Sequence, residues 1–117
     1  MPYSPGTHVI ATLSTTRRPL LEKFEAFRHA ANEWILQHDL CKLGDVYHNF
    51  TPAGFTAVIC LSESHISIHT WPEYDRVNLD IYLSNHERNN DGTVQSLFNA
   101  IVGFFDAHIL QEQTIQR

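Results

Sequence analysis

The chain has 117 residues and an apolar share of 43%, which is typical of a soluble globular protein and predicts one domain over residues 1–117. Its net charge of −5 argues against nucleic-acid binding, because phosphate contact requires clustered Lys and Arg side chains. No run of about 18 apolar residues occurs, and no basic segment precedes an apolar one at the N-terminus. We therefore expect no membrane span or signal peptide, and a cytoplasmic location.

The N-terminal part is predicted to contain a strand, a helix and a second strand. Residues Gly6 to Leu13 are rich in β-branched and apolar side chains and indicate the first strand. Pro19 suits the first turn of a helix, in which apolar side chains recur at three- and four-residue steps until about His38. The second strand is expected over Asp45 to Phe50, before a turn at residues 51–54.

Three more strands are predicted in the middle of the chain. Phe55 to Leu61 is apolar on both faces, which indicates a central strand. His65 to His69 alternates between polar and apolar residues, as a half-buried strand does, and Arg76 to Leu83 alternates in the same way. We expect Cys41 and Cys60 to be buried free thiols, since they lack CxxC spacing.

The C-terminal part is predicted to form a second long helix. Thr93 is a plausible N-cap, and an apolar stripe runs from Val94 to Ile109. The polar tail from Gln111 to Arg117 is expected to be frayed. Four consecutive strands joined by short turns favour an antiparallel sheet, and two amphipathic helices can cover one of its faces. The predicted fold is therefore α+β, a two-layer sandwich with two helices packed on one face of the sheet.

The stretch from Leu61 to Tyr74, LSESHISIHTWPEY, concentrates chemically active side chains. It contains a hydroxyl nucleophile, two imidazoles and two carboxylates, which acid–base and nucleophilic chemistry require. From residue types alone, the solvent-facing side of a strand explains these residues more simply. His65 and His69 would lie about 13 Å apart in a strand, too far to share a metal ion. No GxSxG motif surrounds Ser64, so a Ser-His-Asp hydrolase is not predicted either.

The string SESHISIHTWPEY closely resembles the self-processing segment of the small prokaryotic S-adenosylmethionine decarboxylases, pyruvoyl-dependent enzymes of spermidine synthesis. That family's pattern is ESH, two residues, then IHTWPEY, all of which is present from Glu63 to Tyr74. The likeness extends without a gap from Gly6 to Ser84. It implies a homodimer of two-layer sandwiches that acts on a small-molecule substrate.

The resemblance also implies how the active protein is made. The hydroxyl of Ser64 would attack the carbonyl of Glu63, and the chain would be cut into a β chain, 1–63, and an α chain, 64–117. Residue 64 would become a pyruvoyl group. Its carbonyl would form a Schiff base with the substrate amine and act as an electron sink while CO₂ leaves. No metal or added cofactor is expected.

Other positions match residues with known roles in the family. Thr56 matches a hydroxyl residue that works with His69 in processing. Phe50 matches an aromatic side chain that stacks on adenine, and Glu73 matches a carboxylate of the substrate site. Ser64 and His69 would lie far apart in a straight strand, so a bend or a partner chain must bring these groups together.

Ser84 departs from the family, which has a cysteine here that donates a proton to the decarboxylated carbon. A free thiol has a pKa of about 8.5, and an alcohol is a far weaker acid. Three functions therefore remain open. The leading one is decarboxylation of S-adenosylmethionine, the second is pyruvoyl-dependent decarboxylation of arginine or ornithine, and the third is a non-enzymatic paralogue that binds a partner.

Overall fold

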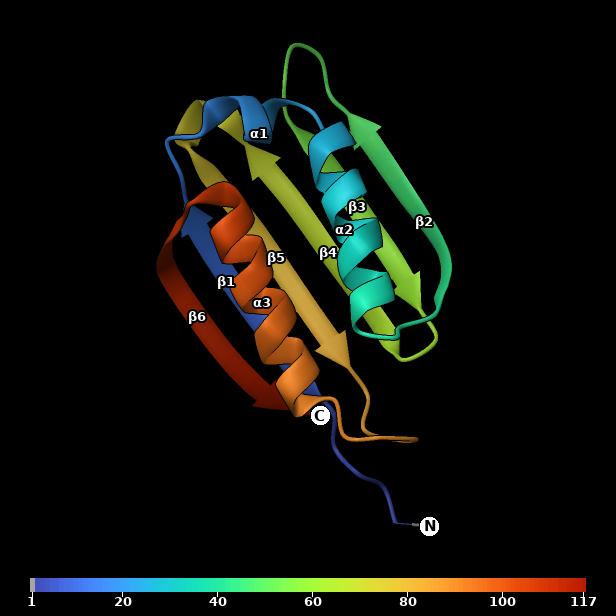
Figure 1. The fold of residues 1–117 in the computed structure, drawn as a ribbon. Coiled ribbons are helices and arrows are strands. Elements are labelled where there is room, and N and C mark those ends of the chain that lie inside the picture. Colours follow the sequence, from blue (N-terminus) through green and yellow to red (C-terminus); the bar gives the residue numbers. More distant parts are fainter. Residues whose placement is uncertain (1) are drawn as a thin grey trace.

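The computed structural model describes residues 2–117 and confirms the α+β two-layer sandwich (Figure 1). One antiparallel six-stranded sheet has the strand order β2-β3-β4-β5-β1-β6. The strands are β1 (Thr7–Ser14), β2 (Lys42–Asn49), β3 (Phe55–Leu61), β4 (Ser64–Trp71), β5 (Arg76–Leu83) and β6 (His108–Gln116). The helices are α1 (Arg18–Glu22), α2 (Glu25–Gln37) and α3 (Asp91–Phe105), with a 3₁₀ turn η1 (Pro72–Tyr74). Within residues 2–117 no helix is long and apolar enough to span a membrane.

The hydrophobic core lies between the sheet and the helices α2 and α3, which run along the same face (Figure 1). Alternation in the strands directs every second side chain toward these helices, so that Ile66 and Ile68 of β4 are buried. Phe27 of α2 joins the two halves of this core. Its ring centroid lies 5.8 Å from that of Phe55 and 6.1 Å from that of Phe105.

The opposite face of the sheet is open, and one prediction about it is wrong. Strand β3 is an interior strand, as predicted, with one face buried and Val58 on the other face 45% exposed. No helix within residues 2–117 covers this side (Figure 1). Cys60 lies on the same open face, and both it and Cys41 are exposed free thiols, not buried ones.

The predicted first helix is broken into α1 and α2. Lys23 is extended, with φ −139° and ψ 151°, and ends α1. The backbone N–H of Phe24 then donates to Oδ1 of Asn49, 2.9 Å away, so a residue of β2 holds the break in place. The predicted N-cap of the last helix is also wrong, since α3 begins at Asp91 after Asn90, and Thr93 lies inside it.

The C-terminal segment is an edge strand and not a frayed tail. Helix α3 ends at Phe105, where Asp106 takes a left-handed conformation with φ 49°, so Ile109 belongs to β6. Strand β6 pairs with β1, and Gly6 and Arg117 exchange two backbone hydrogen bonds of 2.6 and 2.9 Å. These ladder bonds satisfy backbone groups that a frayed tail would leave to water. All residues of β6 are exposed, which explains why hydrophobic periodicity did not reveal the strand.

Candidate functional site

The bond between Glu63 and Ser64 lies in the tight turn between β3 and β4 (residues 61–64), which we name the cleavage hairpin after the cut that the sequence predicts there. Ser64 has φ 136°, a conformation that residues with a side chain rarely adopt. Such backbone strain costs on the order of 1–3 kcal/mol and is maintained only where surrounding contacts hold it. The hairpin therefore holds this peptide bond in a strained geometry.

Contacts from a distant loop fix both polar groups of Glu63. Its carbonyl oxygen accepts a 2.7 Å hydrogen bond from the backbone N–H of Ser84. Its carboxylate pairs with the guanidinium of Arg88 at 3.0 Å and accepts a hydrogen bond from the side-chain amide of Asn90. Partial burial raises the pKa of Glu63, but the hydrogen bonds from Arg88 and Asn90 outweigh burial and hold it below its ordinary value. The carboxylate is therefore a fixed anion.

The hydroxyl of Ser64 faces an imidazole. Its Oγ lies 3.2 Å from Nδ1 of His65. His65 packs against Tyr82 of β5 and His8 of β1, with ring centroids 6.0 and 6.1 Å away. His8 is 7% exposed and lies 2.9 Å from a carboxylate oxygen of Asp80. The cleavage hairpin thus borders a cluster of ionisable side chains.

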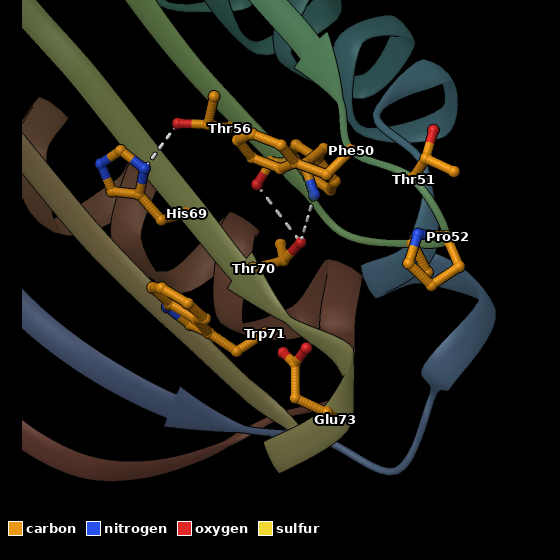
Figure 2. A pocket seen from close by; sticks show the side chains of 10 residues that line it. Phe50, Thr51, Pro52, Thr56, His69, Thr70, Trp71 and Glu73 are labelled. Carbon is orange, nitrogen blue, oxygen red and sulfur yellow. Dashed lines mark hydrogen bonds between the residues drawn. The ribbon is translucent and has the colours of Figure 1, made fainter.

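A separate pocket of about 610 Å³ opens at the far end of β3 and β4. Figure 2 shows Phe50 on one side of this pocket and Trp71 and Glu73 on the other. Phe50 is 50% exposed, and its backbone N–H donates to the carbonyl of Gly54 at 2.8 Å, which closes the turn that carries the ring. Aromatic surfaces beside a carboxylate suit a cationic ligand that contains a flat ring.

The hydroxyl of Thr56 and the imidazole of His69 meet at the edge of this pocket. The two residues are directly opposite each other in β3 and β4, and Thr56 Oγ1 lies 2.5 Å from His69 Nδ1 (Figure 2). Thr70 faces the core instead, where its hydroxyl donates to the carbonyl of Leu21 and accepts from the backbone N–H of Phe55. The structure therefore pairs Thr56 with His69.

The predicted site residues fall into two groups at opposite ends of β4. Glu63, Ser64 and Ser84 meet at the cleavage hairpin. Phe50, Thr56, His69 and Glu73 line the pocket. Ser64 and His69 are five positions apart, which in a strand amounts to about 17 Å. The pairing of β4 with β3 and β5 is continuous, so no bend within the chain shortens this separation.

Sequence reasoning missed several residues of the cleavage hairpin and its surroundings. Arg88 and Asn90 fall in a polar loop with no sequence signal, and their contact with Glu63 spans 25 and 27 residues. Arg117, which falls in the tail that the sequence predicts to be frayed, lies with its guanidinium 3.1 Å from Nδ1 of His8. The only sequence signal that Arg117 belongs to an ordered strand is the weak alternation of the residues of β6. Among residues 2–117 no group of three or more His, Cys, Asp or Glu side chains is arranged to hold a metal ion.

Comparison with known proteins gives a consistent result. The family model described as S-adenosylmethionine decarboxylase matches residues 7–117. A protein of Archaeoglobus fulgidus, named S-adenosylmethionine decarboxylase proenzyme, is 46% identical over 77 residues, which cover 66% of this chain and 69% of that protein. A protein of Picrophilus torridus with the same name is 37% identical over 91 residues, covering 78% of this chain and 70% of its own length.

Structural comparison extends the similarity to nearly the whole chain. The crystal structure of the adenosylmethionine decarboxylase from Aquifex aeolicus VF5 superimposes with a TM-score of 0.86 and 26% sequence identity. The match covers 99% of this chain and 92% of that one, β6 included. By its sequence and its fold, this chain belongs to the S-adenosylmethionine decarboxylase family.

Proposed function

We propose that this protein is a self-cleaving, pyruvoyl-dependent decarboxylase of S-adenosylmethionine that serves spermidine synthesis. The observation that carries the proposal is the geometry of the Glu63–Ser64 bond. A strained backbone at Ser64, a hydroxyl beside that bond and a fixed carbonyl at Glu63 favour intramolecular attack. Cleavage there would give chains 1–63 and 64–117.

Self-cleavage begins with attack by Ser64 Oγ on the carbonyl carbon of Glu63. The C–N bond then breaks, so that an ester replaces the amide and the nitrogen of Ser64 becomes an amine. During the attack, negative charge develops on the carbonyl oxygen of Glu63. The backbone N–H of Ser84 already donates to that oxygen at 2.7 Å, which is the geometry of an oxyanion-hole donor. Because this donor is a backbone group, the exchange of Cys for Ser at position 84 leaves it in place.

Elimination completes the cut. A base removes the α-proton of residue 64, and the bond from Cβ to Oγ breaks, so that the main-chain carboxylate of Glu63 leaves as the new C-terminus of chain 1–63. The resulting enamine becomes an imine that water hydrolyses with release of ammonia. By resemblance we assign His69, assisted by Thr56, to this processing. The two side chains are already paired at 2.5 Å.

A second copy of the chain is needed to unite the two groups of site residues. In one chain about 17 Å separates Ser64 from His69, by the rise of a strand. The open face that carries His69 also exposes apolar side chains, with Val46 69%, Val58 45% and Trp71 46% exposed. We therefore propose a homodimer formed through this face, in which each site combines the hairpin of one copy with the pocket of the other.

The pocket supports S-adenosylmethionine as the substrate. This molecule combines a flat adenine ring with a sulfonium cation. The half-exposed ring of Phe50 can stack on adenine, and the Glu73 carboxylate and the indole of Trp71 favour the cation. Arginine and ornithine are cationic but lack the heterocycle that an exposed aromatic ring would recognise.

The residues around position 64 fit a pyruvoyl group there. Residue 64 is a serine with a strained backbone, and the side chains beside its hydroxyl can assist cleavage. When formed, this group supplies the electron sink for loss of CO₂. The chain's own residues would bind and orient the substrate through Phe50 and Glu73.

The substrate assignment is tested by following CO₂ release by the cleaved protein from S-adenosylmethionine, arginine and ornithine side by side. We expect S-adenosylmethionine to react fastest, and Phe50→Ala to weaken its binding more than that of either amino acid. Faster release from an amino acid would overturn the substrate assignment. Cleaved protein that releases no CO₂ from any of the three would favour the non-enzymatic paralogue.

Arg88→Ala is expected to slow self-cleavage by about 10- to 100-fold, because a misplaced reacting group typically costs that much. Arg88 ties the Glu63 carboxylate to the carbonyls of His38 and Asp39, at 3.3 and 3.0 Å from its guanidinium. The conversion of full-length chain into fragments, followed by gel electrophoresis, measures the rate. Arg17→Ala, which removes a cation elsewhere on the surface, is the matched control. Equal rates for the two variants would show that the contacts of Arg88 do not position the bond.

A further inference from the structure

We propose that His65 is the general base that takes the proton from Ser64 Oγ in the first step of self-cleavage. The inference rests on the proposed function, because it assigns a role within that cleavage. Its main support is contact, since Nδ1 of His65 lies 3.2 Å from Ser64 Oγ. A general base must lie within hydrogen-bond reach of the proton that it removes, and this contact is close to that limit.

The other candidate bases are less suitable. The carboxylate of Glu63 is already bound by Arg88 and Asn90 and has a lowered pKa, so it is a weak base. Within one chain His69 lies about 17 Å from Ser64 along β4, and its Nδ1 is engaged with Thr56; in the proposed dimer we assign it to the later elimination. Of the three groups, His65 is the one whose nitrogen contacts Ser64 Oγ.

The surroundings of His65 keep its imidazole neutral. Burial and then the neighbouring His8 lower its pKa, Asp80 opposes them, and Arg117 adds to the lowering. Two further ionisable groups face the ring, the thiol of Cys60 directly opposite in β3 and the phenol of Tyr82 directly opposite in β5. The neutral form, with its proton on Nε2, leaves Nδ1 free to accept the proton of the serine. The pKa lies below 6.5, so the base is active at neutral pH.

The step balances without any co-reactant. As Ser64 Oγ bonds to the carbonyl carbon of Glu63, its proton moves to Nδ1 of His65. As the C–N bond breaks, the imidazolium returns this proton to the departing nitrogen of Ser64, which becomes an amine. His65 ends neutral, and the chain has only exchanged an amide for an ester.

Hydroxylamine separates this step from the later elimination, because it cuts an ester and leaves an amide intact. Full-length chain is made by cell-free synthesis, and its fragments are followed by intact mass with and without hydroxylamine. We expect His65→Gln to slow fragment formation by about 10²–10⁴-fold under both conditions, since the ester forms far more slowly without the base. His69→Ala should accumulate the ester, so hydroxylamine should release a fragment that begins with an intact Ser64.

Two controls guard against misfolding. His29→Gln replaces an exposed histidine of α2 that pairs with Glu33, and it should cleave like the wild type. In the wild-type chain, ester is allowed to form at each test pH and is then cut by hydroxylamine at one fixed pH. Its rate of formation should rise with pH through the pKa of His65, below 6.5, and then level off as the imidazole becomes neutral. This second measurement needs no substitution at all.

The outcomes separate the inference from the function on which it rests. If the wild-type chain cleaves but His65→Gln cleaves at the same rate, or if the wild-type rate does not change between about pH 5 and 7, around the ordinary pKa of histidine, His65 is not the base. If the wild-type chain forms no fragments with or without hydroxylamine, the proposed self-cleavage fails, and the role of His65 fails with it.

Discussion

Ser64→Ala is expected to leave the protein as a single uncut chain of 13.5 kDa. Alanine has no hydroxyl, so nothing can attack the carbonyl of Glu63 and no ester can form. The expected effect is complete loss of fragments, because uncatalysed hydrolysis of a peptide bond does not compete on the time scale of a preparation. Gel electrophoresis and intact mass of the purified variant measure it.

Ser62→Ala is the matched control. It removes another hydroxyl from the same turn, two residues away, and keeps the backbone N–H of residue 62 that donates to the carbonyl of Cys41 at 2.9 Å. This variant should be cut like the wild type. Fragments from Ser64→Ala, or none from Ser62→Ala, would show that the hydroxyl of Ser64 is not the specific nucleophile.

Ser84→Cys is expected to raise CO₂ release from S-adenosylmethionine by about 10²–10⁴-fold, the usual contribution of a positioned general acid. A thiol with a pKa of about 8.5 donates a proton far more readily than an alcohol. The backbone N–H of residue 84 remains bonded to Glu63, so self-cleavage should continue at its previous rate. Rates of cleavage and of CO₂ release, measured on the same preparation, separate the two effects.

Ser84→Ala and Cys60→Ala complete this comparison. If the Ser84 hydroxyl donates no proton, Ser84→Ala should turn over like the wild type. Cys60 is exposed on the open face and pairs with His65 across β3 and β4, so Cys60→Ala tests whether this thiol already serves as donor. Unchanged turnover in Ser84→Cys would contradict the view that a proton donor is what the wild-type site lacks.

The sheet was largely predictable because alternation is a local signal. Strands β3 and β5 begin and end at the predicted residues, since their buried side chains recur at every second position. The break after α1 was not predictable, because an amide from Asn49 holds it across 25 residues of sequence. Strand β6 was missed because it is stabilised by backbone pairing with β1 and has no buried face.

The same difference between local and long-range signals decides which parts of the candidate site could be predicted. The string from Glu63 to Tyr74 proposes Ser64 and His69 as candidates, because short motifs keep their spacing in sequence. The residues that fix Glu63 lie in a polar loop and meet it only in the folded chain. The distance between the cleavage hairpin and the pocket also required the structure, since it depends on β4 being straight and evenly paired.

The intact mass of the purified wild-type protein tests the central claim most directly. The account predicts two polypeptides, residues 1–63 and residues 64–117, with the second lighter by one ammonia than a chain that begins with serine. That mass identifies both the cut site and the pyruvoyl group. A single uncut chain from a folded preparation, or a second fragment that retains Ser64, would contradict it.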